Sequence, residues 1–436
     1  MVRLLKKRTT AAKSDDPKTR IKNLSQLRRT VAGRDPPISE LIETGFLPTL
    51  VEYLEAEDSK IRYEAAWIIS LILLGTDAHI KAIVNAGVIR PLIKLLSSDD
   101  LVNVEQAIWA LEKIIGENKE FRDQCLQFGI VDPLLKFIEP ETPLRVLKII
   151  GWIFLRLCLH KIEPLTASTA TFQKMLPALL YLIQHSDHEI LQNALSTIAH
   201  ITDRGPLNVR LILDAKFLPH LLKLLEHTEM KIVIPALHSI GNMATINEKQ
   251  TKELLEHDIL KLIAPLLRIN ETQINREAVW FISNVAASAP NHIHDIFDAK
   301  LMSSVNKLLV NSDPETQTEA AWVISNIVDG GEQDELVIIR LFEWDVIESM
   351  CVVLQMENDD LIYILLKVLD NMLEIVPYNK TDILLKLLKH NGEDKDFAQL
   401  SSIIVNKLFV GKNNKRLDDN NKWVQLKAEV RQKIEL

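Results

Sequence analysis

The segment Glu277–Asn284, which reads Glu-Ala-Val-Trp-Phe-Ile-Ser-Asn, is almost repeated at Glu319–Asn326 as Glu-Ala-Ala-Trp-Val-Ile-Ser-Asn. The two segments lie 42 residues apart, and the apolar residues in each are spaced as on one face of a helix. The interval recurs earlier, where Trp67 and Trp109 are 42 residues apart and Trp152 follows after 43. A fixed interval between helical segments predicts a chain of tandem repeats.

A second marker keeps the same interval. Gly45, Gly87 and Gly129 are 42 residues apart, and a proline follows each within a few residues. Glycine accepts the positive φ of a tight helix end, and proline suits the first turn of the next helix. The prolines are Pro48, Pro91 and Pro133, and the glycine register continues at Lys174, Lys216, Asp258 and Lys300. Each period therefore predicts a short helix, a turn and two longer helices, with Asp258 as a helix N-cap.

The length of the period indicates the architecture. Helical repeats of about 40–47 residues are typical of HEAT and armadillo proteins, in which each unit buries its apolar face against its neighbours. The sequence predicts an all-α fold, a right-handed superhelical solenoid of about nine to ten three-helix repeats. We place this solenoid at residues 16–410, after a short, flexible basic segment at 1–15. A polar linker and a capping helix follow at 411–436, the helix with apolar residues at Trp423, Leu426, Val430 and Ile434.

Charge and composition exclude several classes of protein. The formal net charge is −8, whereas a sequence-independent nucleic-acid binder needs a cationic surface. No apolar stretch approaches the ~18 residues of a membrane span, and the charged start Met1–Lys7 is unlike a signal peptide. We therefore expect a soluble intracellular protein without nucleic-acid or membrane partners. Cys125, Cys158 and Cys351 lie in apolar helical patterns and are expected to be buried, reduced thiols.

The sequence contains no recognisable catalytic motif. P-loop, GxGxxG and HExxH patterns are absent. His292 and His294 have no third candidate ligand nearby, so we expect them in a solvated loop. Three aspartate pairs between the helical patterns are expected to be caps and turns, namely Asp99-Asp100, Asp359-Asp360 and Asp418-Asp419. We expect no enzyme activity, no metal and no cofactor.

The repeated octapeptide resembles a segment of a known family. Glu277–Asn284 and Glu319–Asn326 look like the Glu-Ala-x-Trp-x-x-Ser/Thr-Asn segment of importin-alpha proteins. Supporting matches at Glu105–Leu111, Phe121–Asp123 and Pro235–Asn242 belong to a resemblance that runs from about residue 16 to about residue 410. It implies an armadillo-repeat cargo adaptor of the cytoplasm and nucleus. In this family the third helices line a concave groove that binds nuclear localisation signals, which are short, extended, Lys/Arg-rich peptides.

The family has two peptide sites, and the smaller one is preserved. A Trp and an Asn four residues apart lie on one face of a helix. Indoles of successive repeats can flank the stems of Lys and Arg and attract their charges, at ~0.5–2 kcal/mol per contact, while the Asn amide can bond a peptide backbone. The resemblance assigns this minor site to Asn242, Glu277, Trp280, Ser283, Asn284, Glu319, Trp322 and Asn326. His238 replaces a family arginine at one end.

The larger site is degenerate. The resemblance assigns it to Trp67, Gln106, Trp109 and Trp152. Where the family has Asn four residues beyond each Trp, this chain has Leu71, Lys113 and Arg156. Each lost Asn removes a hydrogen bond of ~0.5–1.5 kcal/mol, and the two cations are expected to repel a basic peptide. The alternative is that Lys113 and Arg156 pair with Glu112, Glu117 or other acids.

The first residues separate two functions. The family has a long basic N-terminal segment that binds importin-beta and folds back over the groove. Here the stretch before the first repeat offers only Arg3, Lys6, Lys7, Arg8 and Lys13. We therefore expect an open groove and weak or no importin-beta binding. One interpretation is a nuclear-import adaptor that binds cargo proteins through basic localisation signals, mainly at the minor site. The alternative is a non-transporting armadillo scaffold that binds a protein or peptide partner in the same groove.

Overall fold

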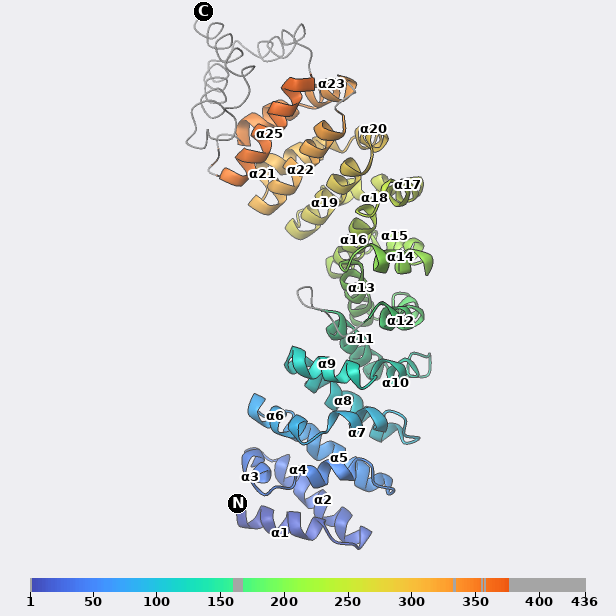
Figure 1. Cartoon of the computed structure of the whole chain (residues 1–436), viewed down its shortest axis with the longest axis vertical. Helices are drawn as coiled ribbons and strands as arrows, with labels where there is room; N and C mark the ends of the chain where they lie inside the picture. The colour runs from blue at the N-terminus through green and yellow to red at the C-terminus, as the bar shows by residue number, and fades with distance from the viewer. Residues whose placement is uncertain (1, 160–167, 332–334, 354–355, 357, 376–436) are drawn as a thin grey trace, which may run out of the picture. The chain divides into compact units, whose positions relative to one another are not determined.

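The computed structural model describes residues 2–159, 168–331, 335–353, 356 and 358–375. It divides into two compact units, Met1–Leu224 and Leu225–Leu436, which are described separately (Figure 1). Within the described residues every regular element is a helix. This confirms the prediction of an all-α fold.

The helices keep the order of the repeats. Those of the first unit are α1 (Val2–Ala12), α2 (Pro17–Val31), α3 (Ile38–Glu43), α4 (Leu47–Tyr53), α5 (Ser59–Ile72), α6 (Asp77–Asn85), α7 (Ile89–Leu95), α8 (Leu101–Glu117), α9 (Lys119–Gln127), α10 (Val131–Leu135), α11 (Leu144–Cys158), α12 (Thr169–Leu182), α13 (His188–Thr202), α14 (Pro206–Asp214) and α15 (Leu218–Leu224). Those of the second unit are α16 (Met230–Ala244), α17 (Glu248–Glu256), α18 (Ile259–Leu266), α19 (Thr272–Ser288), α20 (Pro290–Asp298), α21 (Met302–Asn311), α22 (Pro314–Gly330), α23 (Glu335–Glu343), α24 (Val346–Val353) and α25 (Asp359–Ile375).

A repeat contains two short helices and one long helix. In the repeat α17–α18–α19 the lengths are 9, 8 and 17 residues. The prediction of one short and two long helices was therefore wrong. At the end of the second helix the carbonyl of Leu266 accepts a 3.0 Å hydrogen bond from Asn275 Nδ2 and a 3.3 Å bond from the backbone N–H of Ile269.

The glycine register marks the turn between the two short helices. Gly45, Gly87 and Gly129 have φ of 72°, 89° and 77°. The register keeps this left-handed conformation without glycine at Lys216, Asp258 and Lys300. Asp258, with φ of 56°, lies at the N-cap position of α18 as predicted, but its side chain makes no cap bond; its carboxylate lies 2.7 Å from Lys261 Nζ instead. Lys174 departs from the register because it lies inside α12.

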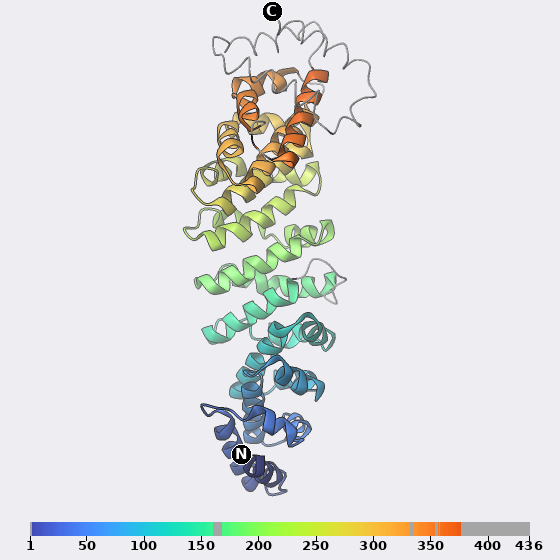
Figure 2. The same cartoon turned by 90° about the vertical axis from the view of Figure 1, so that its left-hand side faces the viewer.

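The third helices of successive repeats pack against one another within each unit. In the first unit α2, α5, α8, α11 and α13 are in contact in series, and in the second unit α16, α19, α22 and α25 are (Figure 2). Their inner faces are apolar, and Phe281 and Ile282 are completely buried. Truncating such a buried Phe to Ala typically costs ~3–5 kcal/mol. The opposite faces of these third helices are therefore held in place by the packing of their apolar faces.

The predicted flexible N-terminal segment is largely helical. Residues 2–12 form α1, which packs against α2. Leu5, Thr9 and Ala12 recur at helical spacing and are all buried, and this buried stripe explains why the segment is ordered as a helix rather than flexible. The predicted solenoid limit at residue 410 and the helix containing Trp423 lie outside the described residues.

Candidate functional site

Two positions recur on the outer face of the third helices. Counted from the start of each helix, the ninth and thirteenth residues lie one turn apart on one face, and we call them the ladder positions. In the first unit the ninth residues are Trp67, Trp109, Trp152 and Ser196, and the thirteenth are Leu71, Lys113, Arg156 and His200. In the second unit the ninth residues are His238, Trp280, Trp322 and Lys367, and the thirteenth are Asn242, Asn284, Asn326 and Asn371.

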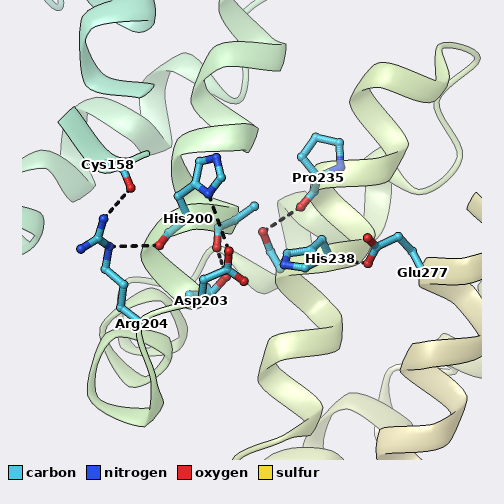
Figure 3. Close-up of polar contacts among 10 residues, drawn as sticks. Cys158, His200, Asp203, Arg204, Pro235, His238 and Glu277 are labelled. Carbon is cyan, nitrogen blue, oxygen red and sulfur yellow. Dashed lines mark hydrogen bonds and ion pairs between the residues drawn. The ribbon is translucent and has the colours of Figure 1, made fainter. Parts of the chain in front are cut away.

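The indole of Trp280 is held by the preceding third helix. Gly241 leaves room for the ring, because a Cβ built there would lie only 2.2 Å from Trp280 Cζ3. His238 stacks on the indole, with ring centroids 5.2 Å apart and planes inclined by 18°. His238 Nδ1 also lies 2.8 Å from Glu277 Oε2 (Figure 3). The imidazole is therefore held between an indole and a carboxylate of the next helix.

The asparagines of the second unit bond back to the preceding third helix. Asn284 Nδ2 donates to the carbonyl of Gly241 at 3.4 Å. Asn326 Nδ2 donates to both the carbonyl and the hydroxyl oxygen of Ser283 at 3.0 Å. These bonds fix the orientation of each amide. The carbonyl oxygen of each amide is an acceptor that these bonds do not use.

A second indole and carboxylate lie on α22. The side chain of Trp322 is 40% exposed. Burial raises the pKa of the Glu319 carboxyl above its usual value, and the negative charge of Glu277 raises it further. Arg276 opposes this rise, but its guanidinium pairs with Asp313 at 3.2 Å and with Glu315. Glu319 therefore has no ion pair among the described residues.

In the first unit the tryptophans are covered by cations of the chain itself. Arg28 Cζ lies 4.1 Å from the centroid of the Trp67 ring, and Arg28 Nε lies 2.7 Å from Glu64 Oε2. Glu64 is the sixth residue of α5, as Glu277 and Glu319 are of α19 and α22. Arg28, Trp67 and Glu64 thus repeat the arrangement of His238, its indole and its carboxylate.

The two predicted repulsive cations also lie on indoles. Lys113 Nζ is 5.3 Å from the Trp109 centroid, and Arg156 Cζ is 5.5 Å from the Trp152 centroid. Arg156 Nη2 donates to the carbonyl of Gly116 at 3.3 Å, much as Asn284 does to its own preceding helix. These side chains therefore occupy the indole faces that the degenerate major site would need.

The acids proposed as alternative partners have different roles. Glu112 Oε1 lies 3.5 Å from Lys113 Nζ, a long ion pair. Glu117 is near Asp77, and burial together with that carboxylate raises the pKa of Glu117. Gln106 is the sixth residue of α8 and is half-buried, so the acid found there in α5 is replaced by a neutral amide. The helix of Trp109 therefore lacks the sixth-position carboxylate that lies near the indoles of Trp67 and Trp280.

Comparisons with known proteins concern the repeats and the family. A profile of the Armadillo/beta-catenin-like repeat family matches residues 34–73 and 76–115. Importin subunit alpha-3 of Caenorhabditis elegans is 38% identical over 213 residues, which cover 49% of this chain and 41% of that protein. Importin subunit alpha-1a of Oryza sativa subsp. japonica is 32% identical over 204 residues, covering 46% of this chain and 38% of the relative. The chain is a divergent importin-alpha-like armadillo protein.

The matched length is limited, because each of these curated relatives is covered over only about two fifths of its length. The crystal structure of an engineered protein aligns with a TM-score of 0.76 over 99% of this chain and 98% of that one, at 23% identity. At this identity the likeness supports the fold alone. Together with the repeat matches at residues 34–73 and 76–115, it confirms the predicted all-α armadillo solenoid.

Other predicted residues of this importin-alpha-like protein have structural roles. Cys125 and Cys158 are buried free thiols, as predicted, and burial raises the pKa of each to about 12. Arg204 donates to the carbonyl of Cys158 (Figure 3). The loop prediction for His292 was wrong: it lies in α20, is 5% exposed, and its Nδ1 is 2.8 Å from Ser288 Oγ. The side chain of Cys351 is outside the description.

Two of the predicted aspartate pairs lie at helix starts. Asp100 caps α8 by accepting a 3.1 Å bond from the backbone N–H of Val102, as predicted, and Asp359-Asp360 begins α25. The pair Asp418-Asp419 lies outside the described residues. In the part of the chain that the structure describes, no helix has the length and apolar character of a membrane span, and no group of three or more His, Cys, Asp or Glu side chains is arranged for a metal.

Sequence reasoning missed several residues at the ladder positions or beside them. Arg28 and Glu64 escaped notice because the tryptophan register alone does not reveal what covers an indole. Lys367 and Asn371 escaped because the last described interval is three residues longer than 42, Trp322 and Lys367 being 45 apart. The four-residue spacing of Lys367 and Asn371 was the available signal.

Proposed function

We propose that the second unit binds Lys/Arg-rich peptide segments at Trp322 and Glu319, with Trp280 as the neighbouring wall. Support comes from two places where the same side-chain pair already holds a cationic or ionisable group. Arg28 lies on Trp67 and pairs with Glu64, and His238 stacks on Trp280 beside Glu277. These contacts indicate how an indole at the ninth position and a carboxylate at the sixth can bind a cation together.

The corresponding position on α22 is unfilled. The preceding helix supplies Trp280 at its ninth position, as α16 supplies His238, whereas α2 supplies Arg28 from its twelfth position. Among the described residues no cation is stacked on the Trp322 indole. The pKa of Glu319 is raised because burial and the charge of Glu277 both disfavour the ionised form of its carboxyl group. A Lys or Arg placed there would relieve this cost and gain a cation–π contact of ~0.5–2 kcal/mol.

The amides beside the indoles suit an extended backbone. Asn284 and Asn326 are oriented by their bonds to the preceding helices. Their remaining polar groups can bond peptide N–H and C=O groups, at ~0.5–1.5 kcal/mol each. The full set proposed for this minor site also contains Asn242 and Ser283, the latter as the oxygen partner of Asn326.

The corresponding function is a nuclear-import adaptor in the cytoplasm and nucleus, whose cargo proteins carry basic localisation signals. The relatives are named as importin alpha subunits. A second candidate, a non-transporting scaffold, is favoured by a separate observation: the indoles of the first unit are covered by Arg28, Lys113 and Arg156. Only one of the family's two peptide sites would then be available. Neither candidate involves catalysis.

Fluorescence anisotropy with a labelled peptide that contains a Lys-Arg pair tests the proposed site. Trp322→Ala should weaken binding about two- to thirtyfold, because a cation–π contact of ~0.5–2 kcal/mol is lost. Glu319→Gln should also weaken it. Phe128→Ala is a matched control, because Phe128 is likewise 40% exposed and lies away from the ladder. Equal affinities of Trp322→Ala and wild type would exclude this site.

A transport assay separates the two candidate functions. In permeabilised cells an adaptor should accumulate a fluorescent cargo in nuclei when importin-beta is added, and the Trp322→Ala variant should not. Binding of the peptide without nuclear accumulation would support the scaffold.

A further inference from the structure

The last described ninth position of the second unit carries a positively charged side chain instead of an indole. Lys367 is the ninth residue of α25, in the place that Trp280 and Trp322 occupy on α19 and α22. The thirteenth residue of α25 is Asn371, so the ladder spacing of the two positions is kept while the indole is replaced by an ammonium group.

Hydrogen bonds also join the asparagines of the second unit to the preceding third helices. Asn284 and Asn326 bond the carbonyls of Gly241 and Ser283, the twelfth residues of α16 and α19. Asn371 Nδ2 donates instead to the side chain of Asp329, the sixteenth residue of α22, about one turn later. Lys367 lies one turn before Asn371 on the same face of α25 and so faces this end of α22.

The charge of Lys367 is only loosely matched within the protein. Its side chain is 50% exposed, and Nζ lies 3.9 Å from Asp329 Oδ2. A direct ammonium–carboxylate hydrogen bond is about 2.7–2.9 Å long. The other oxygen of the same carboxylate is bonded to Asn371. Lys367 can therefore bind the carboxylate of another molecule without breaking a close ion pair.

A bound peptide would meet this ammonium group after leaving Trp322, because α22 and α25 pack side by side. A basic peptide residue at that point would be repelled, whereas an aspartate or glutamate would be attracted. From this geometry, and resting on the proposed peptide site, we infer that Lys367 makes the second unit select segments in which a basic pair is followed, on the α25 side, by an acidic residue.

An aspartate scan tests this selectivity. The probes are peptides with a central Lys-Arg pair in an uncharged Ser/Ala background, with one Asp moved through each flanking position. For wild type, one position on one side of the pair should tighten binding about two- to fivefold, the range of an exposed ion pair. Lys367→Ala should abolish that preference, and Lys367→Glu should reverse it, so that Lys at the same position binds more tightly than Asp.

Several controls keep the outcome unambiguous. Lys367 is half-exposed, so its substitutions leave the core intact, which helical circular dichroism can verify. Lys261→Glu, on the 75% exposed Lys261 side chain of α18, changes the net charge equally away from the ladder and should retain the wild-type preference. An identical Asp profile for wild type and Lys367→Glu would overturn the inference. If no peptide bound wild type at all, the proposed peptide site itself would fail.

Discussion

Removing the cations that cover the tryptophans of the first unit should create a second peptide site. The perturbation is the double substitution Lys113→Asn and Arg156→Asn. It uncovers the rings of Trp109 and Trp152, on which these side chains lie at 5.3 and 5.5 Å. It also places an amide at the position that is occupied by Asn on the helices of the second unit.

The magnitude follows from the contacts that a peptide must displace. Each cation–π contact at a partly exposed site is worth ~0.5–1 kcal/mol. Arg156 adds a charged hydrogen bond to the carbonyl of Gly116, worth about 1.5 kcal/mol at the lower end of its class because 3.3 Å is long. The two cation–π contacts and the hydrogen bond together amount to roughly 2.5–3.5 kcal/mol, so peptide affinity at this surface should rise by up to about sixty- to three-hundredfold. The free energy of unfolding should fall by a similar amount.

Isothermal titration calorimetry with a Lys/Arg-rich peptide measures the effect. The background variant Trp322→Ala weakens the second unit, so that heat from the first can be resolved. Arg145→Asn serves as a matched control, because Arg145 is 73% exposed and pairs with Glu105 at the edge of the same surface. If the double variant bound the peptide no better than this control, covered indoles would not be the reason for a weak site.

Three further predictions concern single residues. Gly241→Ala should push the Trp280 ring aside, lowering the free energy of unfolding by ~1–3 kcal/mol and weakening peptide binding; urea denaturation and anisotropy check both. The folded-state pKa of Glu319 is raised above 4.5. Compared with a variant that has a neutral side chain there, the free energy of unfolding therefore falls as pH rises from 4.5 through the folded-state pKa. Glu319→Gln should accordingly unfold at higher urea than wild type at pH 7, with the difference vanishing below about pH 4.5, even though the variant binds cationic peptides less well. Cys125 and Cys158, with thiol pKa near 12, should resist iodoacetamide at pH 7 until the protein is denatured, as peptide mass mapping can show.

The fold was largely predictable because it depends on local signals repeated many times. The glycine register located the turns at Gly45, Gly87 and Gly129, which all have positive φ, but failed at Lys174, which lies inside α12. The lengths of the second and third helices were not predictable in the same way. They depend on how the helices of one repeat pack against those of the next, which exists only after folding.

The candidate site was predictable only where its residues belong to one helix. Trp280 and Asn284 share a face because of their spacing alone. At Trp67 and Trp280 the side chain that covers the indole belongs to the preceding repeat: Arg28 precedes Trp67 by 39 residues, whereas His238 precedes Trp280 by 42. No constant interval connects the two cases, so the covered and uncovered indoles could not be distinguished before the helices were placed beside each other.

The covering of Trp152 by Arg156 has a consequence for competition among ligands. A side chain attached to the same helix as its indole meets that indole at an effective concentration of millimolar or more, and this concentration does not change when the protein is diluted. Free basic peptides at micromolar levels would have to overcome that difference before any contact was gained. The first unit should therefore bind free polycations poorly even when they are abundant. A partner of its ladder surface would have to gain its affinity from contacts that Arg156 and Lys113 do not make.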